Sequence, residues 1–274
     1  MSLRNAMNTY ARKFIYKHRA RSLITSAEED PASLWWPSLC QAAALVRNTG
    51  DHALYTRLLA AYDPTLPLQP VSGIEFVGSG GGNGTLSAYR RVSINGQIFF
   101  EKVYQTGSQA HRRCLWFYED VAPRLEGKLR FPRLVNVHTG CRISVLNFEY
   151  CPGAQIQHEN FFTVSMAALR VLLALDIHKD ERLMRKSFAA DPRLTDFRSE
   201  LNYTNEREAA LCAAQTSTIA GKILDLERLA TDSGQVFGHG DLAPNNIFPS
   251  GEVADWDTAG FFPIGYDAAI LAVT

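Results

Sequence analysis

Apolar residues recur with a helical period at both ends of the chain and with a strand period in its middle. Three helices are predicted before residue 70, at residues 1–27, 37–47 and 52–62. Short apolar runs separated by Gly and Asn turns then predict strands, and helical spacing returns after residue 152. We therefore expect an N-terminal helical extension, a sheet-containing lobe and a mainly helical lobe, at residues 1–70, 71–151 and 152–274.

The middle part predicts an antiparallel sheet of five strands. The runs with strand period occupy residues 73–77, 85–94, 97–104, 131–138 and 141–150. Asn95-Gly96, between the second and third runs, is a strong signal for a two-residue hairpin turn. A helical pattern over residues 108–124 separates the third run from the fourth. The expected fold class is therefore α+β.

The composition narrows the class of protein. The 274 residues include 28 basic and 28 acidic side chains, and 46% of all residues are hydrophobic. These values are ordinary for a soluble globular protein, and a net charge of zero gives no reason to expect a nucleic-acid partner. The sequence gives no indication of the oligomeric state.

The cysteines and the apolar runs bear on the cellular compartment. Five cysteines are widely spaced and form no CxxC pair, which predicts neither a disulfide framework nor a zinc site. The sequence has no run of about 18 apolar residues and no apolar core of a secretory signal near its start. We expect reduced thiols and a cytoplasmic setting.

Oxygen-bearing side chains suited to phosphoryl transfer come late in the chain. Asp241 precedes Asn246 by five residues, and Asp255 ends the short apolar run that follows. Phosphoryl transfer needs a carboxylate near the attacking hydroxyl and oxygen ligands for Mg²⁺, and protein kinases meet this need with the same order of residues. The alternative interpretation is a Gly/Pro/Asn turn between two buried strands, capped by acids.

The complete motif in this region resembles that of a known family. His239-Gly240-Asp241 with Pro244-x-Asn246, followed by Asp255-Trp256-Asp257, resembles the aminoglycoside phosphotransferase and choline kinase-like family. Many members have a second His two residues after the Asp, where this chain has Ala243. The resemblance covers about residues 71–270 and implies a two-lobed protein-kinase-like fold.

The resemblance also implies cofactors and roles. ATP and Mg²⁺ are the implied cofactors, with a hydroxyl of a small molecule as acceptor. Asp241 is the implied catalytic residue, and Asn246 and Asp255 are the implied metal ligands. His239 and Asp257 flank these residues in supporting positions. In relatives, the Asp of a Gly-x-Pro-x-x-Asp segment braces the catalytic loop, and Asp267 matches it.

A glycine-rich turn and a strand lysine complete the implied nucleotide site. Gly80, Gly81, Gly82 and Gly84 lie between two predicted antiparallel strands, where backbone N–H groups can approach phosphates. Lys102 is on the third predicted strand, the position of the phosphate-binding lysine in kinase-like folds. The alternatives are a flexible turn and an ordinary exposed lysine.

In kinases a glutamate from the next helix holds this lysine. The resemblance places Cys114 where that glutamate is expected, and the nearest acid is Glu119, about 140° further round the helix. Two interpretations stay open. Either Glu119 pairs with Lys102 through a shifted register, or Lys102 lacks a partner.

The end of the fifth strand resembles the hinge between the two lobes of the family. There an apolar strand ends in Glu149-Tyr150-Cys151-Pro152-Gly153. The resemblance implies that backbone groups around Glu149 and Cys151 bond the adenine edge. The alternative is a plain exit from a strand into a turn.

The expected function is ATP-dependent phosphate transfer to a small molecule such as an amino alcohol, a sugar or an aminoglycoside. One alternative is a nucleotide-binding scaffold protein with a degraded kinase fold. Another is a membrane-associated kinase of a lipid or a cell-envelope sugar, suggested by the basic amphipathic helix over residues 1–27. Residues 179–200 mix six basic with five acidic side chains, which weighs against a polycationic acceptor. Relatives continue for further helices, so we expect the C-terminal part of the acceptor site to be either missing or minimal.

Overall fold

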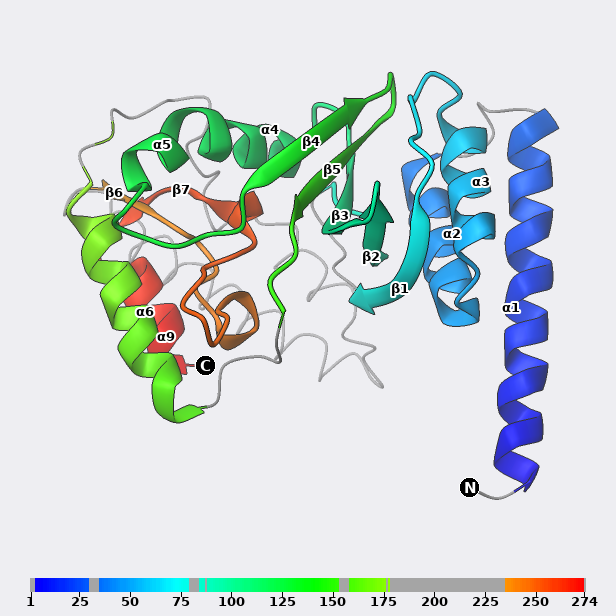
Figure 1. The fold of residues 1–274 in the computed structure, drawn as a ribbon, viewed down its shortest axis with the longest axis horizontal. Coiled ribbons are helices and arrows are strands. Elements are labelled where there is room, and N and C mark those ends of the chain that lie inside the picture. Colours follow the sequence, from blue (N-terminus) through cyan, green and yellow to red (C-terminus); the bar gives the residue numbers. More distant parts are fainter. Residues whose placement is uncertain are drawn as a thin grey trace, which may run out of the picture. The chain divides into compact units, whose positions relative to one another are not determined.

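The computed structural model describes residues 3–29, 35–78, 84–86, 88–152, 158–175, 177 and 235–273 (Figure 1). The chain divides into two compact units. The first consists of Met1–Gln155 and Phe248–Asp257, and the second of Ile156–Ile247 and Thr258–Thr274. The domain boundaries drawn from the sequence at residues 70 and 151 stay a prediction. The mixed-charge stretch 179–200 lies outside the described residues.

The first unit contains the predicted antiparallel sheet of five strands, in the order β1-β2-β3-β5-β4. Its strands are β1 (Ser72–Gly78), β2 (Tyr89–Ile94), β3 (Gln97–Gln105), β4 (Leu134–Thr139) and β5 (Ile143–Glu149). The hairpin turn between β2 and β3 uses Asn95 and Gly96 at φ 52° and 81°. Positive φ at both positions gives the turn a twist that matches its strands. The second strand, predicted over residues 85–94, begins at Tyr89, and Thr85 forms an isolated bridge to Tyr104.

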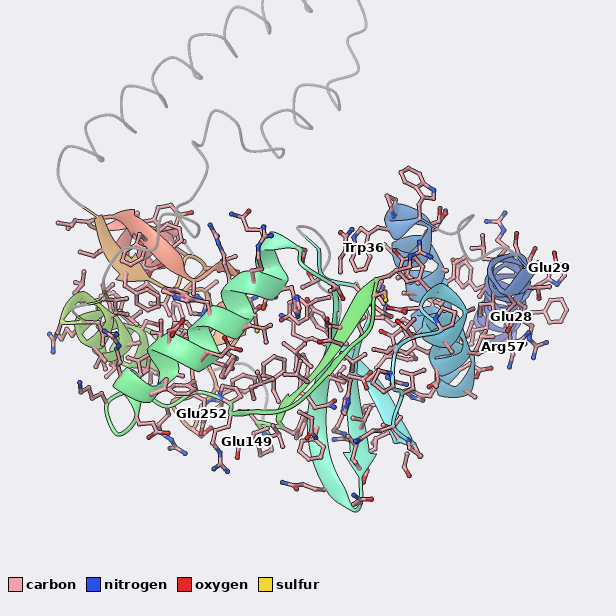
Figure 2. The ribbon with its side chains drawn as sticks, turned by 90° about the horizontal axis from the view of Figure 1, so that it is seen from above. Glu28, Glu29, Trp36, Arg57, Glu149 and Glu252 are labelled. Carbon is pink, nitrogen blue, oxygen red and sulfur yellow. The ribbon has the colours of Figure 1, made fainter. Side chains whose placement is uncertain are left out.

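Three helices of the N-terminal extension pack together beside the sheet (Figure 1). They are α1 (Leu3–Glu29), α2 (Trp36–Thr49) and α3 (His52–Tyr62). Asp51 caps α3 by accepting from the N–H of Leu54 at 3.0 Å, and Lys17 of α1 reaches the same carboxylate at 2.6 Å. Arg57 of α3 donates to Glu28 of α1 at 2.6 Å (Figure 2).

The extension and the sheet share one hydrophobic core. Side chains from all three helices are buried in it together with residues of the sheet and its connections, among them Ile24, Leu39, Leu58, Leu86, Val103 and Ile143. Burial of a large aliphatic side chain contributes about 1.5–3 kcal/mol. The helices before residue 70 therefore belong to the folded body of the first unit. Within the described residues, no helix is long and apolar enough to cross a bilayer.

Asp63, at the end of α3, ties the extension to the turn between β4 and β5. Its carboxylate accepts from the hydroxyl of Thr65 at 2.5 Å, from the N–H of Arg142 at 2.6 Å and from the N–H of Ile143 at 3.0 Å. Gly140 is part of this turn and lies against Asp63. A Cβ at Gly140 would be 2.3 Å from Asp63 Oδ2. The contact therefore requires a residue without a side chain at this position.

The helix predicted over residues 108–124 consists of three parts. They are α4 (Gln109–Trp116), the π-helical turn η2 (Phe117–Val121) and α5 (Ala122–Leu125). Pro123 has no N–H to donate to the preceding turn, and Ala122 donates instead to the carbonyl of Phe117, five residues back. This local change of register alters which side chains face the sheet.

The second unit contains a two-stranded sheet and, among its described residues, the helices α6 (His158–Leu173) and α9 (Tyr266–Val273). β6 (Gln235–Gly238) pairs antiparallel with β7 (Gly260–Pro263), so that Gly238 lies opposite Gly260. Helix α6 packs against β6 and against α9. The loop that follows β6 carries the candidate catalytic residues.

Candidate functional site

A buried carboxylate holds the start of the loop after β6. Asp267, on α9, accepts from the N–H of His239 at 2.7 Å and from the N–H of Gly240 at 2.8 Å. His239 is buried, and its Nδ1 accepts from the N–H of Asp241 at 3.2 Å. Thr258 adds a hydrogen bond to the carbonyl of His239 at 2.9 Å. These bonds fix the backbone that presents Asp241.

Gly240 lets the loop pass close to β7. Its φ is 82°, a conformation that residues with a side chain rarely adopt. A Cβ at this position would lie 2.5 Å from Phe262 Cζ and 2.6 Å from the carbonyl oxygen of Thr258. The second of these atoms belongs to the backbone and cannot turn aside. A glycine is therefore required here for two independent reasons.

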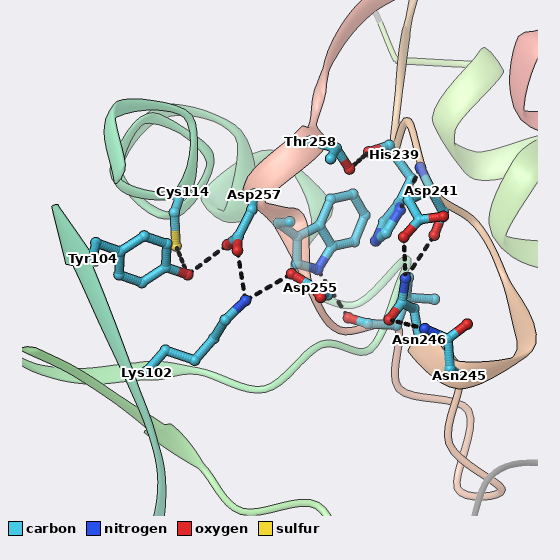
Figure 3. A network of polar contacts seen from close by, with 12 residues as sticks. Lys102, Tyr104, Cys114, His239, Asp241, Asn245, Asn246, Asp255, Asp257 and Thr258 are labelled. Carbon is cyan, nitrogen blue, oxygen red and sulfur yellow. Dashed lines mark hydrogen bonds and ion pairs between the residues drawn. The ribbon is translucent and has the colours of Figure 1, made fainter. Parts of the chain in front are cut away.

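Asn246 and Asp241 are joined twice (Figure 3). The amide nitrogen of Asn246 donates to the backbone carbonyl of Asp241 at 2.8 Å and to its Oδ2 at 3.0 Å. Asn246 is 4% exposed and lies on the 3-10 turn η5 (Pro244–Asn246). Its amide oxygen accepts from Asn245 Nδ2 at 3.3 Å. The pair orients one carboxylate and one amide oxygen relative to each other.

In the first unit, Lys102 of β3 lies between two aspartates (Figure 3). Its Nζ is 2.7 Å from Asp255 Oδ1 and 2.5 Å from Asp257 Oδ2, and its side chain is 4% exposed. Burial alone would lower the pKa of Lys102. The two carboxylates outweigh that effect and raise its pKa well above the ordinary value. Lys102 is therefore a buried, charged group at neutral pH.

The backbone around these aspartates is fixed by Trp256. Its ring stacks on Phe117 of η2 with 3.9 Å between centroids and 6° between planes, and its Nε1 donates to the carbonyl of Val253 at 2.8 Å. Asp255 has φ 68°, a left-handed conformation that few residues other than Gly adopt, Asp being one of those that tolerate it better. Backbone strain of this kind costs about 1–3 kcal/mol and persists where the surrounding structure imposes it.

Tyr104, two residues after Lys102 on the same face of β3, is a site residue that the sequence did not single out for a role. Its hydroxyl donates to Asp257 Oδ1 at 2.5 Å and lies 3.6 Å from the sulfur of Cys114. Burial raises the pKa of Tyr104 well above its ordinary value, and burial also raises the pKa of Asp257. The alternation of side chains along a strand could have identified Tyr104, because it puts Tyr104 on the same face as Lys102.

Both interpretations of the Lys102 partner need correction. Glu119 is exposed on η2, and the carboxylates that contact Lys102 belong to Asp255 and Asp257. The physical reason is the register of the helix, which turns Cys114 toward Tyr104 and leaves Glu119 in solvent. The lysine has partners, but they come from a segment more than 150 residues away in the sequence.

The glycine-rich turn is described at one of its four candidate positions. Gly80, Gly81 and Gly82 lie outside the described residues. Gly84 has φ 97°, and a Cβ there would lie 2.4 Å from the side chain of Ser108, which caps α4. Gly84 is therefore needed for close packing against α4, and its contribution to phosphate binding stays a prediction.

The predicted hinge ends β5. The carboxylate of Glu149 accepts from Arg133 Nε at 2.7 Å, and this pairing lowers the pKa of Glu149. A cavity of about 490 Å³ is lined by residues at this end of the sheet, including Ile98, Arg130, Phe131, Glu149, Cys151 and Glu252. Its lining includes neither Lys102 nor Asp255. The adenine contacts implied for Glu149 and Cys151 stay a prediction.

The chemistry of the donor atoms fits magnesium and a nucleotide. In the second unit Asn246 carries a hard amide oxygen beside the carboxylate of Asp241, and in the first unit Asp255 carries a carboxylate. Magnesium takes one or two such protein ligands together with substrate phosphates. Lys102 supplies a buried cation suited to phosphate. Among the described residues, no group of three His, Cys, Asp or Glu side chains is arranged as a metal centre.

Comparison with known proteins gives one family match. A model of the phosphotransferase enzyme family matches residues 88–274. No curated protein matches the chain significantly. A solved structure of a microcompartment-associated aminopropanol kinase has a TM-score of 0.50 and 16% sequence identity, over 80% of this chain and 73% of that chain. This likeness confirms the protein-kinase-like fold predicted from the sequence.

Two further solved structures are similar at lower scores. An aminoglycoside 3'-phosphotransferase of type VIII has a TM-score of 0.45 and 21% identity, over 76% of this chain and 77% of that chain. An ethanolamine kinase of Plasmodium vivax has a TM-score of 0.46 and 16% identity, over 84% of this chain and 71% of that chain.

Proposed function

The chain belongs to the phosphotransferase enzyme family, and we propose that it moves the γ-phosphate of ATP to a hydroxyl group of a small molecule. The observation that supports this proposal best is the double hydrogen bond from Asn246 to Asp241 in a loop held by Asp267. It places a carboxylate and an amide oxygen in a fixed relation, as phosphoryl transfer requires. A cytoplasmic setting, where ATP is abundant, is part of the proposal.

In this proposal each residue has a separate task. Asp241 orients the acceptor hydroxyl and takes its proton late, because the transition state for phosphoryl transfer is loose. Asn246 and Asp255 provide oxygen ligands for Mg²⁺, which when bound offsets the negative charge of the phosphates. Lys102 and the backbone of the glycine-rich turn hold the phosphates. Catalysis then comes mainly from positioning and charge stabilisation.

The adenine and the acceptor define the specificity of the proposed reaction. Backbone groups around Glu149 and Cys151 bind the adenine edge in this proposal, while the side chain of Glu149 stays on Arg133. The acceptor belongs to the class of amino alcohols, sugars or aminoglycoside-like molecules. Since fold alone does not give the substrate, the acceptor has to be found by a screen.

The test is ADP release from ATP over a panel of amino alcohols, sugars, aminoglycosides and nucleosides. Asp241→Asn should lower kcat by about a hundredfold to ten-thousandfold, the usual contribution of a positioned acid or base. ATP binding, measured by calorimetry, should be nearly unchanged. Asp120→Asn is the matched control, because it makes the same chemical change at an exposed site on η2.

Equal turnover in Asp241→Asn and the wild type would remove the assigned role. ATP binding without transfer to any acceptor in the panel would favour the nucleotide-binding scaffold over the enzyme.

A second candidate is a phosphotransferase that acts at an anionic membrane surface. Phe14 and Ile15 of α1 are 68% and 50% exposed, and Lys13, Arg19 and Arg21 are exposed on the same helix. Apolar side chains beside basic ones are typical of helices that bind the membrane interface. Co-sedimentation with phosphatidylserine vesicles should be weaker for Phe14→Ser/Ile15→Ser than for the control Val135→Ser, which changes an exposed apolar residue of β4. Equal binding by both variants would exclude this candidate.

A further inference from the structure

Asp257 is a carboxylate with both oxygens engaged by protein groups (Figure 3). Its Oδ2 accepts from Lys102 Nζ at 2.5 Å and its Oδ1 accepts from the Tyr104 hydroxyl at 2.5 Å. The side chain of Asp257 is 12% exposed, whereas that of Asp255 is 36% exposed. Of the two aspartates beside the lysine, Asp257 is therefore the more enclosed, and both of its oxygens accept hydrogen bonds.

The helix that faces Lys102 offers no acid for this task. Cys114 of α4 is 1% exposed, and its sulfur lies 3.6 Å from the Tyr104 hydroxyl. Because the single hydroxyl proton goes to Asp257, Cys114 contacts the oxygen of that hydroxyl as a neutral thiol. A chain of contacts therefore leads from α4 through Tyr104 to Asp257 and Lys102.

We propose that Asp257, held by Tyr104, is the positioning residue that keeps Lys102 aimed at the nucleotide phosphates. It does what a helix glutamate does in kinases, where a lysine–glutamate ion pair must be in place for transfer. Asp255, the more exposed carboxylate, is then left to the metal ion. The inference rests on the proposed function, since it concerns the lysine of that same site.

The competing role for Asp257 is that of a second metal ligand. Each oxygen of Asp257 accepts one hydrogen bond and keeps a second lone pair, so a metal ion could bind it only beside the Lys102 cation, on a side chain that is 12% exposed. The two roles therefore differ in what they need. A positioning role acts on Lys102 when no metal is present, whereas a ligand role appears only in the presence of the metal.

The first experiment measures Lys102 in the nucleotide-free full chain and in the absence of metal. The rate at which an amine-reactive acylating reagent labels Lys102 is followed by mass spectrometry of its peptide. Asp257→Asn should increase this rate about tenfold, since the amine then loses one of the two carboxylates that hold it and is freer to meet the reagent. Tyr104→Phe, which keeps the ring and the charge, should increase it several-fold. Lys13, exposed on α1, is the internal control and should be labelled equally in all variants.

The second experiment moves the carboxylate to the helix. Cys114→Glu in the Asp257→Asn background should bring the labelling rate of Lys102 back to within about twofold of the wild type. Cys114→Gln in the same background is the matched neutral control and should leave the rate high. An unchanged rate in both Asp257→Asn and Tyr104→Phe overturns the inference. A high rate in Cys114→Glu/Asp257→Asn, in protein that melts at the wild-type temperature, also overturns it.

Kinetics separate the two roles of Asp257. Tyr104→Phe should lower kcat/KM for ATP about tenfold, with the magnesium concentration for half-maximal rate unchanged. A change in the magnesium concentration for half-maximal rate in that variant would identify Asp257 as a metal ligand and overturn the inference. Labelling needs no turnover, so a failure of the proposed function, with no transfer to any acceptor, is distinguishable from a failure of this inference.

Discussion

Arg90 and Glu101 form an ion pair beneath α3, with 2.7 Å between Arg90 Nη2 and Glu101 Oε1 and side chains 2% and 4% exposed. The guanidinium carbon of Arg90 lies 4.6 Å from the centre of the Tyr55 ring, so the helix covers the pair. Glu101 and Lys102 are neighbours on β3 and point to opposite faces of the sheet. The N-terminal extension therefore covers the face that Lys102 does not use.

Breaking this ion pair should destabilise the protein strongly. Glu101→Gln leaves the Arg90 charge buried without its partner, and removal of one partner of a buried pair costs about 3–5 kcal/mol. The free energy of unfolding by urea measures this effect. Glu75→Gln is the control, because Glu75 is half-exposed and its pair with Arg91 at 3.3 Å should contribute at most about 1 kcal/mol. Equal losses in the two variants would contradict the assignment.

The hydrogen bonds that Asp63 accepts lead us to expect that the protein loses stability in acid. Burial alone would raise the pKa of Asp63, but the hydroxyl of Thr65 and the N–H groups of Arg142, Ile143 and Thr65 outweigh it and lower the pKa. Because the pKa is lower in the folded state, the stabilisation is fully present above the unfolded value of 3.8. It is lost as the pH falls through the folded value.

The variant Asp63→Asn isolates this contribution. At pH 7 it should lower the free energy of unfolding by about 2 kcal/mol, since bonds to a charged acceptor are the stronger ones. The difference from the wild type should shrink below about pH 4. Calorimetry at several pH values measures both numbers. A difference in the free energy of unfolding that stays constant down to pH 2 would show that the charge of Asp63 does not stabilise the fold.

Gly240→Ala should disturb the candidate catalytic loop. The new Cβ meets Phe262 and the backbone oxygen of Thr258, so the loop has to move, and turnover should fall at least about tenfold for a displacement near 1 Å. Gly265→Ala is a matched control, because Gly265 has φ 92° and a Cβ there meets no atom within 4 Å. The control should lose about 1 kcal/mol of stability from backbone strain and keep its turnover. Similar turnover in both variants would argue against a role for the close approach at Gly240.

Asp267→Asn should lower turnover without contact with a substrate. The amide keeps one accepting oxygen and directs two N–H donors at a place where two backbone N–H groups now converge. We expect kcat to fall about tenfold to a hundredfold, with little change in ATP affinity, because the displaced residue is Asp241. Steady-state kinetics and calorimetry measure the two quantities. Loss of ATP affinity with unchanged kcat would show that Asp267 acts elsewhere.

Elements with local signals were predicted well. The helix predicted at residues 52–62 has those bounds in the structure, because Asp51 caps its start and Asp63-Pro64 ends it. The hairpin at Asn95-Gly96 is present because both residues tolerate positive φ. The helix at residues 108–124 was predicted as continuous, and it contains a π-helical turn because Pro123 removes one donor.

By itself the sequence determined the five strands, the N-terminal helices and the residue types of the candidate site, because alternation, caps and short spacings act over a few residues. Only the tertiary structure decided which carboxylates hold Lys102, since Asp255 and Asp257 come from a segment 153 and 155 residues away. It also decided that Glu101, next to Lys102, is a buried partner of Arg90. Pairings across such distances depend on how elements pack, and the packing follows from the shared core rather than from any local pattern.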